Sequence, residues 1–386
     1  MSHILRSIWH VVWMTFNLLA VTLLLLTVLA VHIPPEKAQL LAMLGVAFEW
    51  LVYVNLFFAL TWLFTSRKLW CLVSILALVL SLSGIRNTWP NPFRDEEKPV
   101  AEHQLKVLTY NTHLLQNSTP VDRNELLRYV KNSGADVVCM QEYAVYKDRH
   151  YPTFNAVKRF LADDYPYTYF DFSVHNRRLQ YGLAVYSKYP LINKQSIRIE
   201  TQGNGANRCD IVIPSRGHND TVRLFNNHLQ SNSLVPSDLD SLLHFHAYVP
   251  AKLPTAYAKR SAQARAVRAE IDRSPYPVIV CGDFNDVPVS YTYHTLSQGL
   301  NDAFLSTLHS QLSSLNSHLS SLHSQLSSLN SHLSSLHCSL GHTYVRRHVG
   351  IRIDYILSSP ALRATDFRID ELPFSDHYPV AATLCW

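Results

Sequence analysis

Charged residues are scarce in this chain of 386 residues. Asp, Glu, Lys and Arg make up 16% of it, against about 25% in a typical soluble domain. Up to Lys98 there are seven basic and five acidic residues, which leaves 27 basic and 24 acidic residues beyond that point. The rest of the chain is therefore near-neutral and globular in composition. It lacks the basic stripe expected of a tight, non-specific binder of nucleic acid.

Cysteine is also rare, with six residues in the whole chain. Cys71 falls in an apolar run, and the other five have no spacing typical of a metal site. The set is too small and too unevenly placed for a disulfide framework. We interpret these cysteines as buried or idle thiols.

The low charge has a local origin, because three apolar runs occupy the first hundred residues. Val11–Ile33 has no Asp, Glu, Lys or Arg, and at about 1.5 Å per residue it reaches roughly 34 Å, enough to cross a bilayer. Leu40–Phe64 contains a single acid, Glu49, and Leu69–Ile85 is near the lower length limit of a span. The first run is too long for a cleaved signal peptide, and two more follow it. We expect a transmembrane anchor of about three helices over residues 1–86.

Basic residues beside these runs predict the orientation of the anchor. Arg6 precedes the first run, Arg67 and Lys68 lie between the second and third, and the Pro34–Lys37 loop has no net charge. Since basic loops stay in the cytoplasm, three spans place the rest of the chain outside it. The orientation inverts if the third run does not span. We therefore expect an integral, multi-pass membrane protein whose C-terminal domain is extracytoplasmic and follows a linker at 87–104.

Beyond the linker, short β-branched runs alternate with amphipathic stretches, which is the pattern of an α/β domain. Strands are expected at 106–111, 136–141, 182–187, 222–229, 277–282 and 353–357. Helices are expected between several of them, including Asp122–Lys131 and Lys259–Asp272. Polar residues cluster where these strands end, which is where a sheet enzyme usually keeps its chemistry.

A low-complexity insertion interrupts this domain at 308–340. A fourteen-residue unit occurs at Leu308 and again unchanged at Leu322, and its leucines recur at spacings of four and three. These spacings fit a heptad seam, but serine and asparagine are poor helix formers and charged flanking pairs are missing. The histidines of the copies leave a metal-binding tract open. We favour a tandem expansion tolerated in a surface loop.

Six polar clusters contain the candidate catalytic and metal-binding residues, although each cluster by itself could have a purely structural role. They are TyrAsn at 110–111, GlnGlu at 141–142, AsnHisLeu at 227–229, GlyAspPheAsn at 282–285, IleAspTyr at 353–355 and SerAspHis at 375–377. Asp283 and Asn285 share one strand-end turn, so a carboxylate and an amide converge there. Asp354 is a lone acid in an otherwise apolar strand, where an unpaired charge would be expensive.

Taken together and in this order, the six clusters resemble those of the endonuclease/exonuclease/phosphatase family, from about Leu105 to Leu384. The resemblance implies a catalytic domain over 105–386 with a four-layer α/β sandwich fold, in which two packed β-sheets are flanked by helices. It places the site at one end of the sandwich. It also implies a Mg²⁺- or Mn²⁺-dependent hydrolase of phosphoester bonds.

The resemblance also suggests roles for single residues. The expected catalytic residues are His228, Asp283, Asn285, Asp354 and His377, and the expected metal ligands are Asn111, Glu142 and Asp376. Oxygen ligands of this kind suit a hard cation such as Mg²⁺ or Mn²⁺. Asp354 is expected to accept a hydrogen bond from His377 and to favour its charged form. Arg177 and Tyr181 could touch the substrate, although a solvated loop explains them equally well.

We expect a phosphodiesterase that acts outside the cytoplasm on a lipid or nucleotide phosphoester. A nuclease acting on DNA or RNA is one alternative, and a catalytically silent binding module on the same fold is another. The expected partners are the phosphoester substrate, whether lipid headgroup, nucleotide or nucleic acid, and the membrane, with no obligate protein partner. A transporter is disfavoured because three helices without repeats give no pathway.

Overall fold

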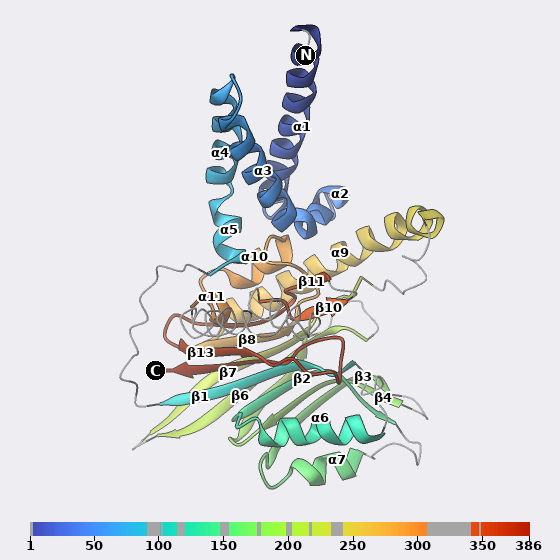
Figure 1. Cartoon of the computed structure of the whole chain (residues 1–386). Helices are drawn as coiled ribbons and strands as arrows, with labels where there is room; N and C mark the ends of the chain where they lie inside the picture. Colours follow the sequence, from blue (N-terminus) through green and yellow to red (C-terminus); the bar gives the residue numbers. More distant parts are fainter. Residues whose placement is uncertain are drawn as a thin grey trace, which may run out of the picture. The chain divides into compact units, whose positions relative to one another are not determined.

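The computed structural model of the chain contains two compact units (Figure 1). The helical unit comprises Met1–Trp89, Asn232–Ser261 and Val287–His294, and the sheet unit comprises Pro90–Ser231, Ala262–Asp286 and Thr295–Trp386. The structure describes residues 3–90, 101, 103–113, 120–146, 154–175, 179–197, 203–215, 218–232, 242–306, 341–346 and 349–386. The boundaries expected at 86 and 104 stay predictions, and the 308–340 insertion lies outside the described residues.

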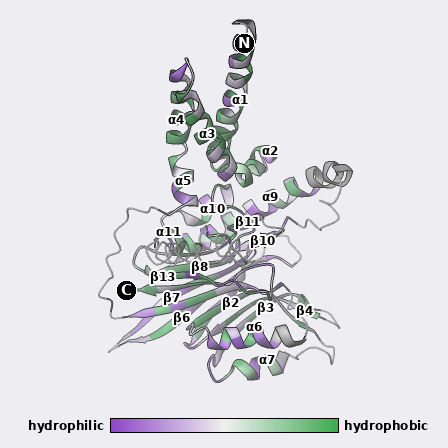
Figure 2. Ribbon diagram, in the orientation of Figure 1, coloured by the Kyte–Doolittle hydropathy of each residue, from purple (hydrophilic) through white to green (hydrophobic). Residues whose placement is uncertain are grey.

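The helical unit contains the apolar segments expected from the sequence. Its first elements are α1 (His3–Ala30), α2 (Gln39–Ala42), η1 (Met43–Ala47), α3 (Phe48–Leu63), η2 (Lys68–Trp70), α4 (Cys71–Leu80) and α5 (Leu82–Thr88). Among the described residues, Ser7–Ala30 and Gln39–Leu63 are long and apolar enough to cross a membrane, and the bent pair α4–α5 would be a third span if counted as one. Figure 2 shows hydrophobic residues along α1, α3 and α4.

The third expected span differs from a straight helix. The stretch Lys68–Leu80 and helix α5 meet at 58° next to Ser81, whose hydroxyl donates to the carbonyl of Ala77 at 2.8 Å. A serine bonded to the preceding turn in this way often bends a helix. Hydropathy did not predict the bend, because the bend depends on a hydrogen bond of Ser81 and the residues around it are as apolar as those of a straight span.

Polar side chains connect the three helical segments. The indole of Trp62 in α3 donates to the amide oxygen of Asn17 in α1 at 2.9 Å, and the amide nitrogen of Asn17 donates to Ser74 of α4 at 2.6 Å. All three residues are fully buried. Hydrogen bonds between buried polar groups are a usual contact between membrane helices, so these bonds join α1, α3 and α4.

The sheet unit contains two six-stranded sheets of mixed direction, flanked by helices. The first has the order β13 (Arg363–Ile369), β14 (Val380–Cys385), β1 (Gln104–Asn111), β2 (Val137–Tyr146), β4 (Leu179–Ser187), β3 (Tyr167–His175). The second has the order β5 (Leu191–Ile197), β6 (Gly205–Ser215), β7 (His218–His228), β8 (Val278–Asp283), β12 (Asp354–Ser358), β9 (Asn301–Asp302). All six strands expected from the sequence are present, and the four-layer α/β sandwich is confirmed.

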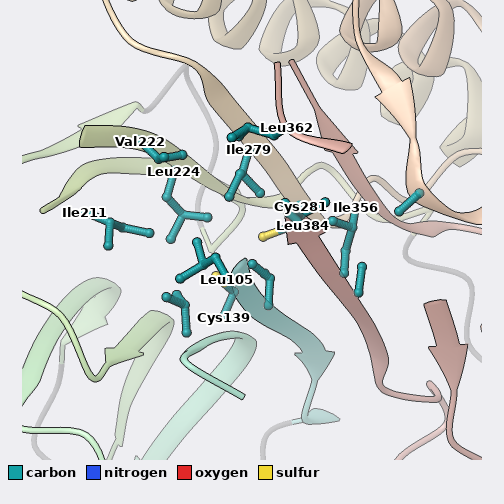
Figure 3. Packing of buried hydrophobic residues seen from close by; sticks show 14 of the residues in the cluster. Leu105, Cys139, Ile211, Val222, Leu224, Ile279, Cys281, Ile356, Leu362 and Leu384 are labelled. Atoms are coloured by element: carbon teal, nitrogen blue, oxygen red, sulfur yellow. The ribbon is translucent and has the colours of Figure 1, made fainter. Parts of the chain in front are cut away.

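Apolar side chains from both sheets fill the space between them (Figure 3). Leu105 and Cys139 come from the first sheet, and Leu224 and Cys281 come from the second, and all four are fully buried. Residues that alternate along a strand point to opposite faces, so every second residue of the central strands reaches this layer. The cysteines that the structure describes as free are buried, in agreement with their interpretation as core thiols.

Two helices cover the outer face of the first sheet. Helix α6 (Pro120–Asn132) and helix α7 (Phe154–Leu161) lie next to each other in Figure 1. Leu126 and Val130 of α6 and Leu161 of α7 pack in one cluster with Leu108 of β1 and Met140 of β2. The helix expected at 122–131 is therefore confirmed.

The remaining elements connect the strands of the second sheet. They are α9 (Leu242–Asp272), α10 (Tyr291–Ser297), α11 (Ala303–Ser306), β10 (Tyr344–Arg346) and β11 (Val349–Ile351). A Cβ atom added to Gly341, whose φ is +82°, would lie 2.4 Å from the ring of Phe304 in α11. Only glycine allows this approach without strain. The chain just after the insertion therefore contacts the chain just before it.

Candidate active site

Asp283 is the centre of the candidate site. It ends β8 and is 1% exposed. The amide nitrogens of Asn111 and Asn285 both donate to its Oδ2 at 2.9 Å, and the Asn285 backbone N–H donates to its Oδ1 at 2.8 Å. Gly282 permits this geometry, because with φ at +121° a Cβ there would lie 2.1 Å from the carbonyl oxygen of Asn227. Three donors therefore fix the position of one buried carboxylate.

The register of the second sheet brings two further candidates to Asp283. His228 is its partner on the parallel strand β7, and Asp354 is its partner on the antiparallel strand β12. Residues paired in this way on adjacent strands lie next to one another. Three of the expected catalytic residues thus meet at one end of one sheet.

His377 completes this group from the loop before β14. Its Nδ1 is 2.9 Å from Asp354 Oδ2, and its Nε2 is 3.8 Å from Asp283 Oδ2. Burial would lower the pKa of His377, but the charges of Asp354 and Asp283 outweigh it and raise the pKa to about 10. His377 is therefore held as a cation between two carboxylates at neutral pH.

His228 has the opposite protonation. Its Nε2 lies 3.4 Å from Glu142 Oε1 and 3.8 Å from Asp283 Oδ2. Burial lowers the pKa of His228 to about 4, with the charge of His377 adding to the decrease and that of Asp283 opposing it. The site thus contains one neutral and one charged imidazole on either side of Asp283.

Glu142 and Asp376 bring carboxylates from the other sheet and from the last loop. Glu142 lies in β2 with φ at +48°, accepts a hydrogen bond from Asn111, and has a side chain that is 21% exposed. Burial raises its pKa, although His377 and His113 oppose the shift. Burial would raise the pKa of Asp376, but the hydrogen bond from His113 and the positive charge of His377 outweigh burial and lower it. Asp376 is thus ionised more readily than Glu142.

The donor set fits a divalent cation held by oxygen atoms. Glu142 and Asp283 are carboxylates whose pKa values are raised by burial, and a bound cation would stabilise their ionised forms. Among the described residues, one group of three titratable side chains has converging ligand atoms: Asp283, Asp354 and His377, within 4.8 Å of one another. The expected ligands Asn111, Glu142 and Asp376 lie beside this group, so the metal assignment stays a prediction.

The two substrate-binding candidates have different outcomes. Tyr181 lies in β4, and burial, followed by the charges of Glu142 and Asp283, raises its pKa. Arg177 lies outside the described residues. The possible contact of either residue with substrate stays a prediction.

Three residues of this site had no signal that singled them out in the sequence. His113 has φ at +43°, donates its backbone N–H to Asn111 Oδ1 at 3.1 Å, and places Nδ1 2.9 Å from Asp376. The amide of Asn204 lies 3.3 Å from His228 Nε2, and Thr343 Oγ1 accepts the backbone N–H of Asp354 at 3.0 Å. Only the closeness of His113 to Asn111 in the chain could have suggested one of them.

A buried polar pair joins the two sheets beneath the site. The amide nitrogen of Gln141 in β2 donates to Asn226 Oδ1 in β7 at 2.7 Å, and Asn226 donates to the carbonyl of Ala184 in β4 at 3.2 Å. Gln141 and Asn226 are both fully buried and each precedes a candidate site residue, Glu142 or Asn227–His228. The pair therefore joins the middle of β2 to the carboxyl end of β7.

Comparison with known proteins gives two family matches. The model of the endonuclease/exonuclease/phosphatase family matches residues 108–377, and that of a domain of unknown function, DUF8431, matches residues 10–88. No curated protein matches the chain.

Several solved structures are similar to the chain at low identity. The endonuclease/exonuclease/phosphatase from Beutenbergia cavernae DSM 12333 is 18% identical with a TM-score of 0.48, covering 73% of this chain and 71% of that one. Truncated Caenorhabditis elegans TDP2 is 19% identical with a TM-score of 0.48, covering 75% and 100%. Sphingomyelinase C from Streptomyces griseocarneus is 18% identical with a TM-score of 0.43, covering 73% and 99%.

Proposed function

The chain belongs to the endonuclease/exonuclease/phosphatase family, and on that premise we propose that it is a metal-dependent phosphodiesterase. The observation that carries the proposal is the arrangement of His228, Asp283 and the Asp354–His377 pair at one end of the second sheet. A silent binding module has no need to hold a neutral imidazole, a charged imidazole and a buried carboxylate together. Mg²⁺ or Mn²⁺ is the proposed cofactor, with Asn111, Glu142 and Asp376 as its ligands.

The protonation states support distinct roles for the two histidines. His377, charged at neutral pH, donates a hydrogen bond to a non-bridging phosphoryl oxygen and stabilises negative charge as it develops. His228 is neutral and lies on the side of Glu142, where it contacts the leaving oxygen. A cation held by Asn111, Glu142 and Asp376 would supply further charge neutralisation at the phosphoryl group.

Asp283 is the group proposed to take the proton from the attacking water. Burial raises its pKa, and a carboxyl group with a raised pKa is a better base near neutral pH. Asn285 donates its amide N–H groups to Asp283 at 2.9 Å and to the carbonyl of Leu229 at 3.0 Å, and it thereby holds in place the carboxylate that receives the proton. In the overall reaction water adds to phosphorus, one P–O ester bond breaks, and the leaving oxygen takes up a proton.

We place the sheet unit outside the cytoplasm. The support is the charge distribution, since Arg6, Arg67 and Lys68 flank the spans on one side and Pro34–Lys37 has no net charge. A reporter that folds only in the cytoplasm, fused after Trp386, is expected to stay dark, and a reporter that is active only outside is expected to work. The reverse pattern would show that α4–α5 does not cross the membrane.

Hydrolysis of bis(p-nitrophenyl) phosphate by the full chain in detergent tests the activity, with Mg²⁺, with Mn²⁺ and with chelator. We expect metal-dependent release of nitrophenol that falls about a thousandfold or more in Asp283→Ala. Asp366→Ala, which removes an exposed carboxylate of β13, is the matched control and should keep the wild-type rate. No release by the folded wild type would favour the binding module, and an active Asp283→Ala would remove Asp283 from the site.

A further inference from the structure

We propose that ordered water is bound between the two sheets, in a polar layer that separates their apolar core from the candidate active site. One side chain from each of four strands builds this layer: Thr109 of β1, Gln141 of β2, Asn207 of β6 and Asn226 of β7. All four residues are 0–1% exposed. Water binding in this layer is independent of the reaction that the candidate active site catalyses.

The alternation of side chains along β6 and β7 places the polar layer. Cys209, two residues after Asn207, and Leu224, two residues before Asn226, both belong to the apolar cluster between the sheets. Residues two apart on a strand share a face, so Asn207 and Asn226 point into the same space. They are also partners in the antiparallel β6–β7 ladder, where the Cβ atoms of partners are about 4.5–5.5 Å apart. His228 lies two residues beyond Asn226, so the layer is directly beneath the site.

The hydrogen bonds of Asn226 determine which way the amide of Gln141 points. Asn226 Nδ2 donates to two backbone carbonyls, those of Met140 at 3.4 Å and Ala184 at 3.2 Å. Asn226 Oδ1 therefore accepts from Gln141 Nε2 at 2.7 Å, and the same Nε2 donates to Thr109 Oγ1 at 2.9 Å. A reversed Gln141 amide would set its oxygen against Asn226 Oδ1. Gln141 Oε1 is thus a buried acceptor that has no hydrogen-bond partner in the part of the chain that the structure describes.

Asn207 adds a buried donor and a second buried acceptor. Neither its Nδ2 nor its Oδ1 has a hydrogen-bond partner among the described residues. Reversing the amide would not change this, because both of its ends are unpaired. Burying an amide without hydrogen bonds is costly, and buried polar groups in proteins are nearly always paired with protein atoms or with ordered water. The surroundings of Asn207 therefore indicate a bound polar molecule.

Water matches the unpaired atoms in kind. They are one donor, Asn207 Nδ2, and two acceptors, Asn207 Oδ1 and Gln141 Oε1. Water both accepts and donates, and a buried water typically makes about three hydrogen bonds to otherwise unpaired groups. A cation fits less well, because the four side chains of the layer include no carboxylate and an N–H group of Asn207 needs an acceptor. Since Asn207 and Gln141 are both neighbours of Asn226, one water can accept from Asn207 Nδ2 and donate to Gln141 Oε1.

The bound water extends the connection between the sheets to β6. Hydrogen bonds between side chains already join Thr109, Gln141 and Asn226, which lie on β1, β2 and β7. Water between Gln141 and Asn207 adds β6 to these three strands. Because the amides that hold it are themselves fixed by their neighbours, this water belongs to the folded sheet unit and not to the solvent of the candidate active site.

A crystal structure of the full chain at about 1.8 Å resolution or better tests the water directly. We expect a density peak within about 2.7–3.2 Å of both the Asn207 amide and Gln141 Oε1, which is the range of hydrogen bonds to water. Absence of such a peak, or a direct hydrogen bond between Asn207 and Gln141, would overturn the proposal. A peak bound only to oxygen atoms at 2.3–2.6 Å, as for a calcium ion, would overturn it as well.

Thermal unfolding of the full chain in detergent gives a second test, with Asn207→Leu as the variant. In a dry layer this substitution removes an unpaired amide, so it should raise the Tm. With water bound, it removes partners of the water and leaves Gln141 Oε1 unpaired, so we expect the Tm to fall by several degrees. Asn219→Leu, at an exposed position of β7, is the matched control and should stay near the wild-type Tm. A Tm of Asn207→Leu equal to or above that of the wild type contradicts bound water.

A second substitution tests whether water links Asn207 to Gln141. In a Gln141→Met background the water has already lost an acceptor, so Asn207→Leu should lower the Tm by clearly less than it does in the wild type. In a Thr109→Val background the full decrease should remain, because Thr109 bonds to the opposite end of the Gln141 amide. Equal decreases in the wild-type and Gln141→Met backgrounds would show that no water joins the two side chains. If these variants do not fold, the density between Asn207 and Gln141 in the wild type decides the question.

Discussion

Replacing Asp354 by asparagine should remove about half of the alkaline sensitivity that His377 gives to the sheet unit. His377 is buried, and its bond to Asp354 at 2.9 Å is its closest charged contact among the described residues. The carboxylates of Asp354 and Asp283 raise the pKa of His377 to about 10 in spite of burial. Asparagine keeps the size of the side chain and removes its charge, so the pKa of His377 should fall.

The size of the effect follows from the linkage between protonation and folding. A folded-state pKa of about 10 against 6.5 in the unfolded chain corresponds to roughly 5 kcal/mol. Because the folded pKa is the higher one, this stability is fully present below pH 6.5 and is lost as the pH rises toward 10. Asp354 acts more strongly on His377 than Asp283 does, so the variant should lose about 2–3 kcal/mol of this dependence.

Thermal unfolding of the full chain in detergent, followed between pH 6.5 and pH 9.5, measures the change. The wild type should lose several degrees of Tm over this range and Asp354→Asn markedly fewer. The other titratable side chains are the same in both proteins, so the difference between the two curves isolates His377. Asp366→Asn, on an exposed position, is the control. Parallel curves for wild type and Asp354→Asn would refute the assignment of the His377 charge to Asp354.

Three further predictions concern the metal, the insertion and the turn at β8. Glu142→Gln should weaken Mn²⁺ binding about tenfold or more in titration calorimetry while His377→Gln leaves it near wild type; the reverse result would move the cation to the buried Asp283 group. Excision of 308–336 should leave hydrolysis of bis(p-nitrophenyl) phosphate intact, and loss of activity in a folded deletion would show that the insertion serves the site. Gly282→Ala should lower the stability of the sheet unit by about 2–4 kcal/mol in denaturant unfolding, because its Cβ would meet Asn227 at a strained φ; an unchanged midpoint would contradict the close approach.

The sequence predicted the sheet unit well because its signals are local. Strands such as 277–282 are short apolar runs that end in polar clusters, and the fold places those polar ends together. The pairing of Asp354 with His377, expected from the resemblance, is present as a hydrogen bond. The family's order of motifs predicted the sandwich, which composition alone did not.

Contacts between residues far apart in the chain were beyond prediction. Asn204 reaches His228 from the start of β6, and no pattern around Asn204 marks it. Val287–His294 packs with the apolar helices although it is far too short to be recognised as a membrane segment. Hydropathy found the third apolar run but not its bend, because the bend depends on the hydroxyl of Ser81.

The contact between Gly341 and Phe304 has a consequence for how this gene can vary. Because Gly341 contacts Phe304 across the insertion, we expect the sheet unit to tolerate different numbers of repeat copies between these two residues. Identical tandem units readily gain or lose copies during replication. Natural variants of this protein should therefore differ in copy number at this position, and a reporter domain inserted there should leave the two sheets undisturbed.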